Sequence, residues 1–257
     1  MTARDNTPRT YEYSRSVFPS IDTKEVLTQI RKQGLYSGFN LPSQPLAEIL
    51  AFTQTTRMHG GFGDVTQAKT HFFPQERAEM AAKTGSNFII GHYAEAALRC
   101  PAIRQIENDP KILSIAHSYF GKPPGSVKTM LWWSFATQAS TQERLGSSQT
   151  VLFHFDEFDY RFLYFSFYLT DVDEMAGAHI CVKGSHNKKS LRLLFSTASQ
   201  SDETILGQYG SENIVTLTGK AGFGFVEDAF AYHKATAPVK RDRLFLQVRV
   251  GSSHRGN

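Results

Sequence analysis

Several features are scarce in this sequence, and each scarcity excludes a class of protein. Only two of the 257 residues are cysteines, Cys100 and Cys181, which leaves no disulfide framework and no thiolate metal site. Such sparing use of cysteine fits a reducing compartment, so we expect a cytoplasmic protein. No apolar run approaches the ~18 residues of a membrane span, and the N-terminus lacks the apolar core of a secretory signal. We therefore expect no membrane partner.

An excess of charge of one sign is also missing. The 28 basic residues are nearly balanced by 24 acidic ones, for a net charge of +4, and the basic residues form no cluster. This pattern argues against a nucleic-acid partner and favours a small-molecule substrate, which can be anionic. Nothing in the composition indicates an oligomeric state.

The hydrophobic periodicity changes near residue 126. Helical spacing precedes this point, over residues 23–33, 44–55, 75–83 and 110–120. Strand-like patterns follow it, over residues 127–137, 150–155, 162–169, 179–182, 213–217, 222–227 and 244–250. We expect one α+β domain, residues 1–257, with a mainly helical part (1–125) packed on one side of a β-sandwich core (126–251). The long, partly polar segment 187–211 is expected to border a site.

The most informative stretch is His154-Phe155-Asp156, which lies in the apolar run 151–156. On a strand, residues i and i+2 point to the same side, so His154 and Asp156 would face one space. One imidazole and one carboxylate are two of the three protein ligands of a two-histidine, one-carboxylate iron site. The doublet alone is weak evidence, because nine histidines and 24 acidic residues give about one such pair by chance. A buried histidine beside a strand-end aspartate explains it equally well.

Two residues further along the chain strengthen the metal interpretation. His233 follows the strand 222–227, and Arg243 begins the last strand. If these two strands form a hairpin, Arg243 lies near His233, while Arg249 lies about 20 Å further along. An arginine close to an iron site can bind one carboxylate of a dicarboxylate cosubstrate through two parallel hydrogen bonds. A salt bridge at the sheet edge is the alternative role for Arg243.

Taken together, this region resembles the phytanoyl-CoA dioxygenase-like family. The resemblance covers residues 126–250 and rests on His154, Asp156, the turn Gly184-Ser185-His186, His233 and Arg243. It implies a double-stranded β-helix, the jelly-roll or cupin-like fold, and an oxygenase that uses iron(II), 2-oxoglutarate and O₂. In that family the positions of His154, Asp156 and His233 carry the iron ligands, and the position of Arg243 carries the partner of the distal 2-oxoglutarate carboxylate.

The chain departs from the family pattern at positions that usually make secondary cosubstrate contacts. Phe155 stands where glutamine is frequent, Ala235 offers no hydroxyl after the distal histidine, and we consider Gln138 and Tyr160 as candidates for these contacts. The resemblance implies that the enzyme hydroxylates a C–H bond of a small polar molecule, with succinate and CO₂ as co-products. The substrate itself is not predicted.

Two rival functions remain open at this point. Two histidines and an aspartate also bind zinc, as in a metal-dependent hydrolase or isomerase of the cupin type. A jelly roll can also be a non-catalytic binding module. We interpret the remaining histidines as structural, surface or ordinarily hydrogen-bonded residues: His59, His71, His92, His117, His179, His186 and His254.

Overall fold

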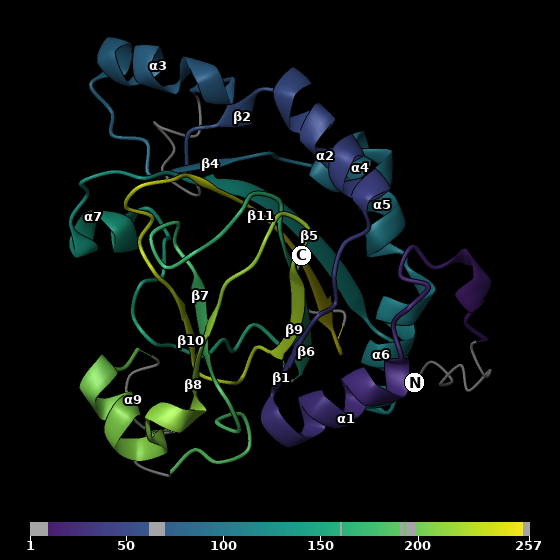
Figure 1. The fold of residues 1–257 in the computed structure, drawn as a ribbon. Helices are drawn as coiled ribbons and strands as arrows, with labels where there is room; N and C mark the ends of the chain where they lie inside the picture. Colours follow the sequence, from purple (N-terminus) through teal and green to yellow (C-terminus); the bar gives the residue numbers. More distant parts are fainter. Residues whose placement is uncertain (1–9, 62–69, 160, 191–192, 194–198, 254–257) are drawn as a thin grey trace, which may run out of the picture.

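The computed structural model describes residues 10–61, 70–159, 161–190, 193 and 199–253. Its centre is an eight-stranded antiparallel sheet in the order β1-β9-β6-β11-β5-β4-β2-β3, and a three-stranded sheet in the order β10-β7-β8 lies beside it (Figure 1). The large sheet consists of β1 (Leu35–Ser37), β2 (Met58–His59), β3 (His71–Phe72), β4 (Ile90–His92), β5 (Ser126–Ser134), β6 (Phe162–Tyr168), β9 (Gly224–Asp228) and β11 (Arg243–Gly251). The small sheet consists of β7 (His179–Val182), β8 (Ile214–Leu217) and β10 (His233–Ala235).

Helices cover the outer face of the large sheet (Figure 1). They are α1 (Thr23–Gln33), α2 (Ser43–Thr55), α3 (Arg77–Thr84), α4 (Ala96–Arg99), α5 (Pro101–Glu107) and α6 (Pro110–Phe120), with 3-10 turns at Tyr13–Arg15 and Pro74–Glu76. The β part of the chain contains two further helices. They are α7 (Thr141–Gly146), which follows β5 in the chain, and α9 (Asp202–Tyr209), which follows β7 and precedes the 3-10 turn Ser211–Asn213.

Local signals set the bounds of the best predicted helices. Helix α1 begins where the Asp22 carboxylate accepts hydrogen bonds from two backbone amides, and it ends at Gly34, whose φ is 73°. Helix α6 has the same design, with Asp109 as its cap. A carboxylate cap satisfies free amide groups, and glycine adopts the left-handed conformation without strain. Both helices match their predicted bounds.

The two faces of the large sheet have different neighbours. On β11, Leu244, Leu246 and Val248 pack into the core shared with the helices. The alternate residue Phe245 packs with Tyr168 and Cys181 in a second core between the two sheets. This alternation follows from the period of two along a strand. The α+β jelly-roll prediction is therefore confirmed, with the helices on one face and the small sheet on the other.

Two predictions about the β part are wrong. Residues 150–155 do not form a regular strand, and only isolated bridges occur there, from Phe153 to Gln200 and from His154 to His233. The predicted hairpin between residues 222–227 and the last strand is also absent, because β9 pairs with β1 and β6 while β11 pairs with β5 and β6. Between β9 and β11 in the chain comes β10, which belongs to the small sheet. Part of the segment 187–211 lies outside the described residues, and its described end contains α9.

Candidate metal centre and its pocket

Two extended segments bring the three predicted ligands together. The backbones of His154 and His233 exchange hydrogen bonds of 2.9 and 2.8 Å, and the amide of Asp156 donates to the carbonyl of Ala229 at 3.0 Å. His154 and Asp156 thus point to the same side, as their i, i+2 spacing predicted. Asp156 Oδ1 lies 3.8 Å from His154 Nε2, and its Oδ2 lies 3.7 Å from His233 Nε2.

This spacing suits a single ion. One ligand atom from each of the three residues lies within 4.8 Å of the others, and no other group of three His, Cys, Asp or Glu residues in the described part of the chain does so. Ligand atoms bound at ~2.1 Å to one ion are separated by about 3–4 Å. Small side-chain adjustments would therefore bring the three donors to bonding distance.

Hydrogen bonds fix the orientation of each donor. Nδ1 of His154 donates to the carbonyl of Leu152, and Nδ1 of His233 donates to that of Ala231, both at 2.9 Å. Because a carbonyl only accepts, Nδ1 carries the proton in both rings and Nε2 is left to bind a metal. The hydroxyl of Tyr164 donates to Asp156 Oδ2 at 2.6 Å and holds the carboxylate.

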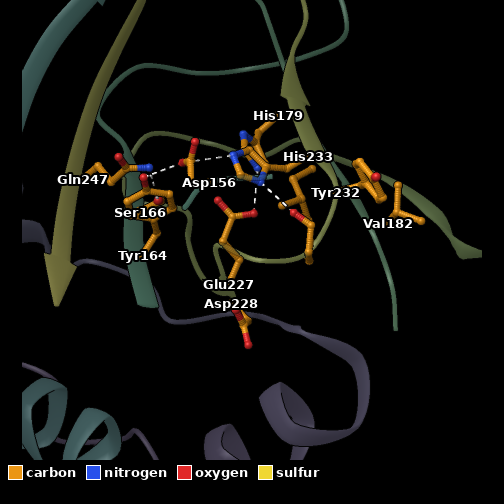
Figure 2. Close-up of polar contacts among 12 residues, drawn as sticks. Asp156, Tyr164, Ser166, His179, Val182, Glu227, Asp228, Tyr232, His233 and Gln247 are labelled. Atoms are coloured by element: carbon orange, nitrogen blue, oxygen red, sulfur yellow. Dashed lines mark hydrogen bonds and ion pairs between the residues drawn. The ribbon is translucent and has the colours of Figure 1, made fainter. Parts of the chain in front are cut away.

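Beside the triad lies a buried, hydrogen-bonded pair of side chains that the sequence did not reveal. His179 Nε2 is 2.9 Å from Glu227 Oε2, and the His179 ring stacks on His233 with centroids 5.5 Å apart. Figure 2 shows Glu227 and His179 beside His233. His179 therefore has an ordinary hydrogen-bond partner, as expected, but it is fully inside the protein and supports a candidate ligand.

The electrostatics favour positive charge at this point. Burial would raise the pKa of Asp156, but the neighbouring imidazoles of His233 and His154 lower it to about 2. Burial would lower the pKa of His233, but Glu227 and Asp156 raise it to about 9. Burial and the neighbouring His233 lower the pKa of His154 to about 4. The carboxylates thus stabilise a positive charge here, whether a proton on His233 or a cation held by the three side chains.

The triad opens into a cavity of about 330 Å³ between the two sheets, a size typical of small-molecule sites. Its walls carry apolar, aromatic and polar side chains, including Met130, Trp132, Ser134, Gln149, Tyr164, His179, Arg243, Phe245 and Gln247. A larger groove of about 820 Å³ lies beside α5 and α6 and includes none of these residues. The chemistry of the triad therefore belongs to the smaller cavity.

Arg243 reaches the same cavity from the opposite sheet. It is the first residue of β11 and only 3% exposed, and its guanidinium donates to the carbonyl of Gly177 and, at 3.3 Å, to Ser134 Oγ. Its Nε has no partner among the described residues. Arg243 thus approaches the triad across the two sheets and not through a hairpin turn.

The other two arginines near the end of the chain lie elsewhere. Arg249 shares the face of Arg243 but does not line the cavity, and its guanidinium lies over the Phe158 ring, 5.3 Å from the centroid. Arg241 is exposed and pairs with Asp173. Among these three arginines, Arg243 combines burial with access to the triad.

Of the two secondary contacts predicted from sequence, one can be located in the described structure. Gln138 is exposed and is not among the cavity-lining residues, and Tyr160 lies outside the described residues. Gln149, which the sequence analysis missed, is 3% exposed and lines the cavity. Arg144 Nη1 donates to its Oε1 at 2.7 Å. Since a guanidinium only donates, the amide nitrogen must face away from Arg144, where it has no partner among the described residues.

The comparisons with known proteins place the fold. No family model and no curated protein matches the sequence. Among solved structures, the carbocyclase SnoK from nogalamycin biosynthesis, a non-heme α-ketoglutarate-dependent enzyme, matches with a TM-score of 0.58 and 18% identity over 92% of this chain and 86% of its own. HygX from Streptomyces hygroscopicus, with nickel and 2-oxoglutarate bound, matches with a TM-score of 0.56 and 12% identity over 90% and 87%.

A third solved structure matches with a similar TM-score and a similarly low identity. The non-heme α-ketoglutarate-dependent epimerase SnoN has a TM-score of 0.56 and 16% identity over 89% of this chain and 83% of its own. Identities this low relate the chains through their fold. The chain therefore has the jelly-roll fold found in these 2-oxoglutarate-dependent enzymes.

Proposed function

We propose that this chain is an iron(II)- and 2-oxoglutarate-dependent oxygenase of the phytanoyl-CoA dioxygenase-like type, which hydroxylates a C–H bond of a small polar molecule. One observation carries the proposal: a two-histidine, one-carboxylate triad and a buried guanidinium face the same small cavity. A zinc hydrolase or a binding module would use the triad or the cavity, but neither needs Arg243. HygX, whose fold is similar, holds nickel and 2-oxoglutarate.

Each residue of the site has a defined task in this proposal. His154, Asp156 and His233 would hold iron(II) through one ligand atom each. Iron and 2-oxoglutarate, once bound, supply the oxidising power that inserts one atom of O₂ into the substrate and releases succinate and CO₂. Arg243 would bind the distal carboxylate of 2-oxoglutarate with charge-assisted hydrogen bonds. Trp132 and Phe245, packed edge-to-face 4.9 Å apart, would exclude water from the cavity.

A small-molecule substrate fits the cavity and the behaviour of similar structures. SnoN has been crystallised with nogalamycin RO and HygX with hygromycin B, so the same fold accepts small molecules in those proteins. The most informative test is a screen of small polar compounds for O₂-dependent succinate formation by the iron-loaded protein. We expect at least one compound to raise succinate formation above the substrate-free rate. Turnover by zinc-loaded protein without 2-oxoglutarate would overturn the proposal.

The presence of Asp156 predicts the type of product. Related iron enzymes that install chlorine lack the carboxylate ligand and place chloride in the position it leaves. In this chain Asp156 would occupy that position, so we expect the product to gain one oxygen atom from O₂ and no halogen, either directly or through a hydroxylated intermediate. Product mass after turnover with ¹⁸O₂ in chloride-containing buffer measures this. A chlorinated product would contradict the prediction.

Gln149 provides a test of the secondary contacts. Its amide nitrogen is a buried donor without a partner among the described residues, and a ligand oxygen would relieve the cost of about 1–3 kcal/mol that such a group carries. Gln149→Glu keeps the shape and the contact with Arg144 but presents an acceptor to the cavity. We expect about tenfold weaker 2-oxoglutarate binding with unchanged metal binding, measured by titration of the metal-loaded protein. Gln138→Glu is the matched control, and an equal effect of both changes would refute a contact through Gln149.

A further inference from the structure

A lysine lies behind the candidate metal centre, surrounded by aromatic rings. Lys189 Nζ is 4.5 Å from the centroid of Phe155, 3.8 Å from that of Phe230 and 4.8 Å from that of Tyr232. The positions of these rings in the chain are informative, because Phe155 separates His154 from Asp156 and Tyr232 immediately precedes His233. One ammonium group therefore contacts residues adjacent in sequence to all three candidate ligands.

The same ammonium joins two backbone segments. It donates to the carbonyl of Ser185, at 3.1 Å, in the turn after β7, and to the carbonyl of Phe230 in the loop before β10. Ser185 strengthens the link, because its hydroxyl donates to the carbonyl of Val182 and accepts from the amide of Tyr232, both at 2.7 Å. The loop that leads into His233 is thus bound to the turn after β7 by Lys189 and by Ser185.

Burying this ammonium costs free energy, which its hydrogen bonds to the two carbonyls must offset. Burial lowers the pKa of Lys189 to about 7, although the negative charge of Asp228 opposes the shift. An apolar side chain of similar length would fill the space among the rings without this desolvation. Directional hydrogen bonds to two carbonyls are what lysine adds. They are useful where the relative position of the two segments matters.

We propose that Lys189 is a positioning residue for the candidate metal centre: it holds the loop before His233 and the Phe155 ring so that the three donor atoms converge on one point. The inference rests on the proposed function in that it requires the triad to bind a divalent metal. It does not depend on the identity of the substrate. Lys189 itself contacts neither the reacting atoms nor any of the three ligand side chains through a described hydrogen bond.

Lys189→Met tests this role, because methionine keeps the volume and loses both hydrogen bonds. With Co²⁺ as the probe, we expect binding to weaken about tenfold to a hundredfold, as is typical when residues that support metal ligands are changed. The visible spectrum of bound Co²⁺ should also change, since the ligand geometry is altered. The melting temperature of the metal-free protein should stay the same or rise.

Two further variants make the result decisive. Lys188→Met removes the same charge from an exposed neighbour and should bind Co²⁺ like the wild type. Lys189→Arg retains a cation that stacks on the rings and donates to carbonyls, and it should restore most of the affinity. Equal Co²⁺ affinity in Lys189→Met and Lys188→Met would refute the inference alone. A parallel loss of affinity and melting temperature would also refute it, whereas a wild type that binds no Co²⁺ would refute the proposed function as well.

Discussion

Asp156→Ala should abolish the binding of one equivalent of iron(II) and all oxygenase activity, while the protein stays folded. The variant leaves two imidazoles and removes the only carboxylate among the three ligands. Carboxylate and imidazole together make the iron site of this type, and two histidines alone hold the ion weakly. Equilibrium dialysis with iron(II) under anaerobic conditions measures the effect, and thermal unfolding checks the fold.

Glu157→Ala is the matched control for this change. It removes an exposed carboxylate from the next residue, so it alters the local charge without touching the triad, and its iron binding should equal that of the wild type. His154→Ala and His233→Ala should behave like Asp156→Ala. A variant with all three ligands replaced by alanine that still binds one iron tightly would show that the metal lies elsewhere.

Arg243→Ala should raise the 2-oxoglutarate concentration needed for half-maximal activity about tenfold to a hundredfold. Charge-assisted hydrogen bonds are worth about 1.5–3 kcal/mol, and each 1.4 kcal/mol is a factor of ten. Arg243 is 3% exposed and faces the triad, so its bonds to a dicarboxylate would be protected from water. Titration of the iron-loaded protein with 2-oxoglutarate measures the shift directly.

Arg249→Ala supplies the comparison for this prediction. Arg249 lies on the same face of β11 but outside the cavity, so its removal should change the 2-oxoglutarate requirement far less. Arg243→Lys should lie between the wild type and Arg243→Ala, because lysine keeps the charge but cannot bind a carboxylate through two parallel bonds. Equal effects of Arg243→Ala and Arg249→Ala, or a larger effect of the latter, would remove Arg243 from the site.

The features that sequence predicted well are those with a local physical cause. The range 23–33 predicted for a helix matches α1, because the Asp22 cap and the left-handed Gly34 act within one helical turn. The strand predicted at residues 244–250 forms as β11, and its residues alternate between two cores because of strand geometry. His154 and Asp156 face one space although no regular strand forms there, because the bridge to His233 keeps this stretch extended.

The features that sequence missed depend on contacts between distant residues. The hairpin that was expected to bring Arg243 to His233 does not exist, and the arginine reaches the cavity only because the two sheets face each other. The pair of His179 and Glu227 joins β7 to β9 and leaves no periodic pattern in the sequence. The orientation of the Gln149 amide in the cavity likewise depends on its hydrogen bond with Arg144. Such contacts follow from sheet order and register, which no local pattern specifies.

In the described ranges, no helix is both long and apolar enough to cross a bilayer.

Anaerobic titration of the iron(II)-loaded protein with 2-oxoglutarate tests the central claim most directly. If His154, Asp156 and His233 hold iron and Arg243 binds the cosubstrate beside it, a weak visible charge-transfer band should appear and saturate at one equivalent of 2-oxoglutarate per iron. The band should be absent from Asp156→Ala and should require far more 2-oxoglutarate in Arg243→Ala. A wild-type protein that binds iron at the triad but develops no band at any 2-oxoglutarate concentration would contradict the proposed function.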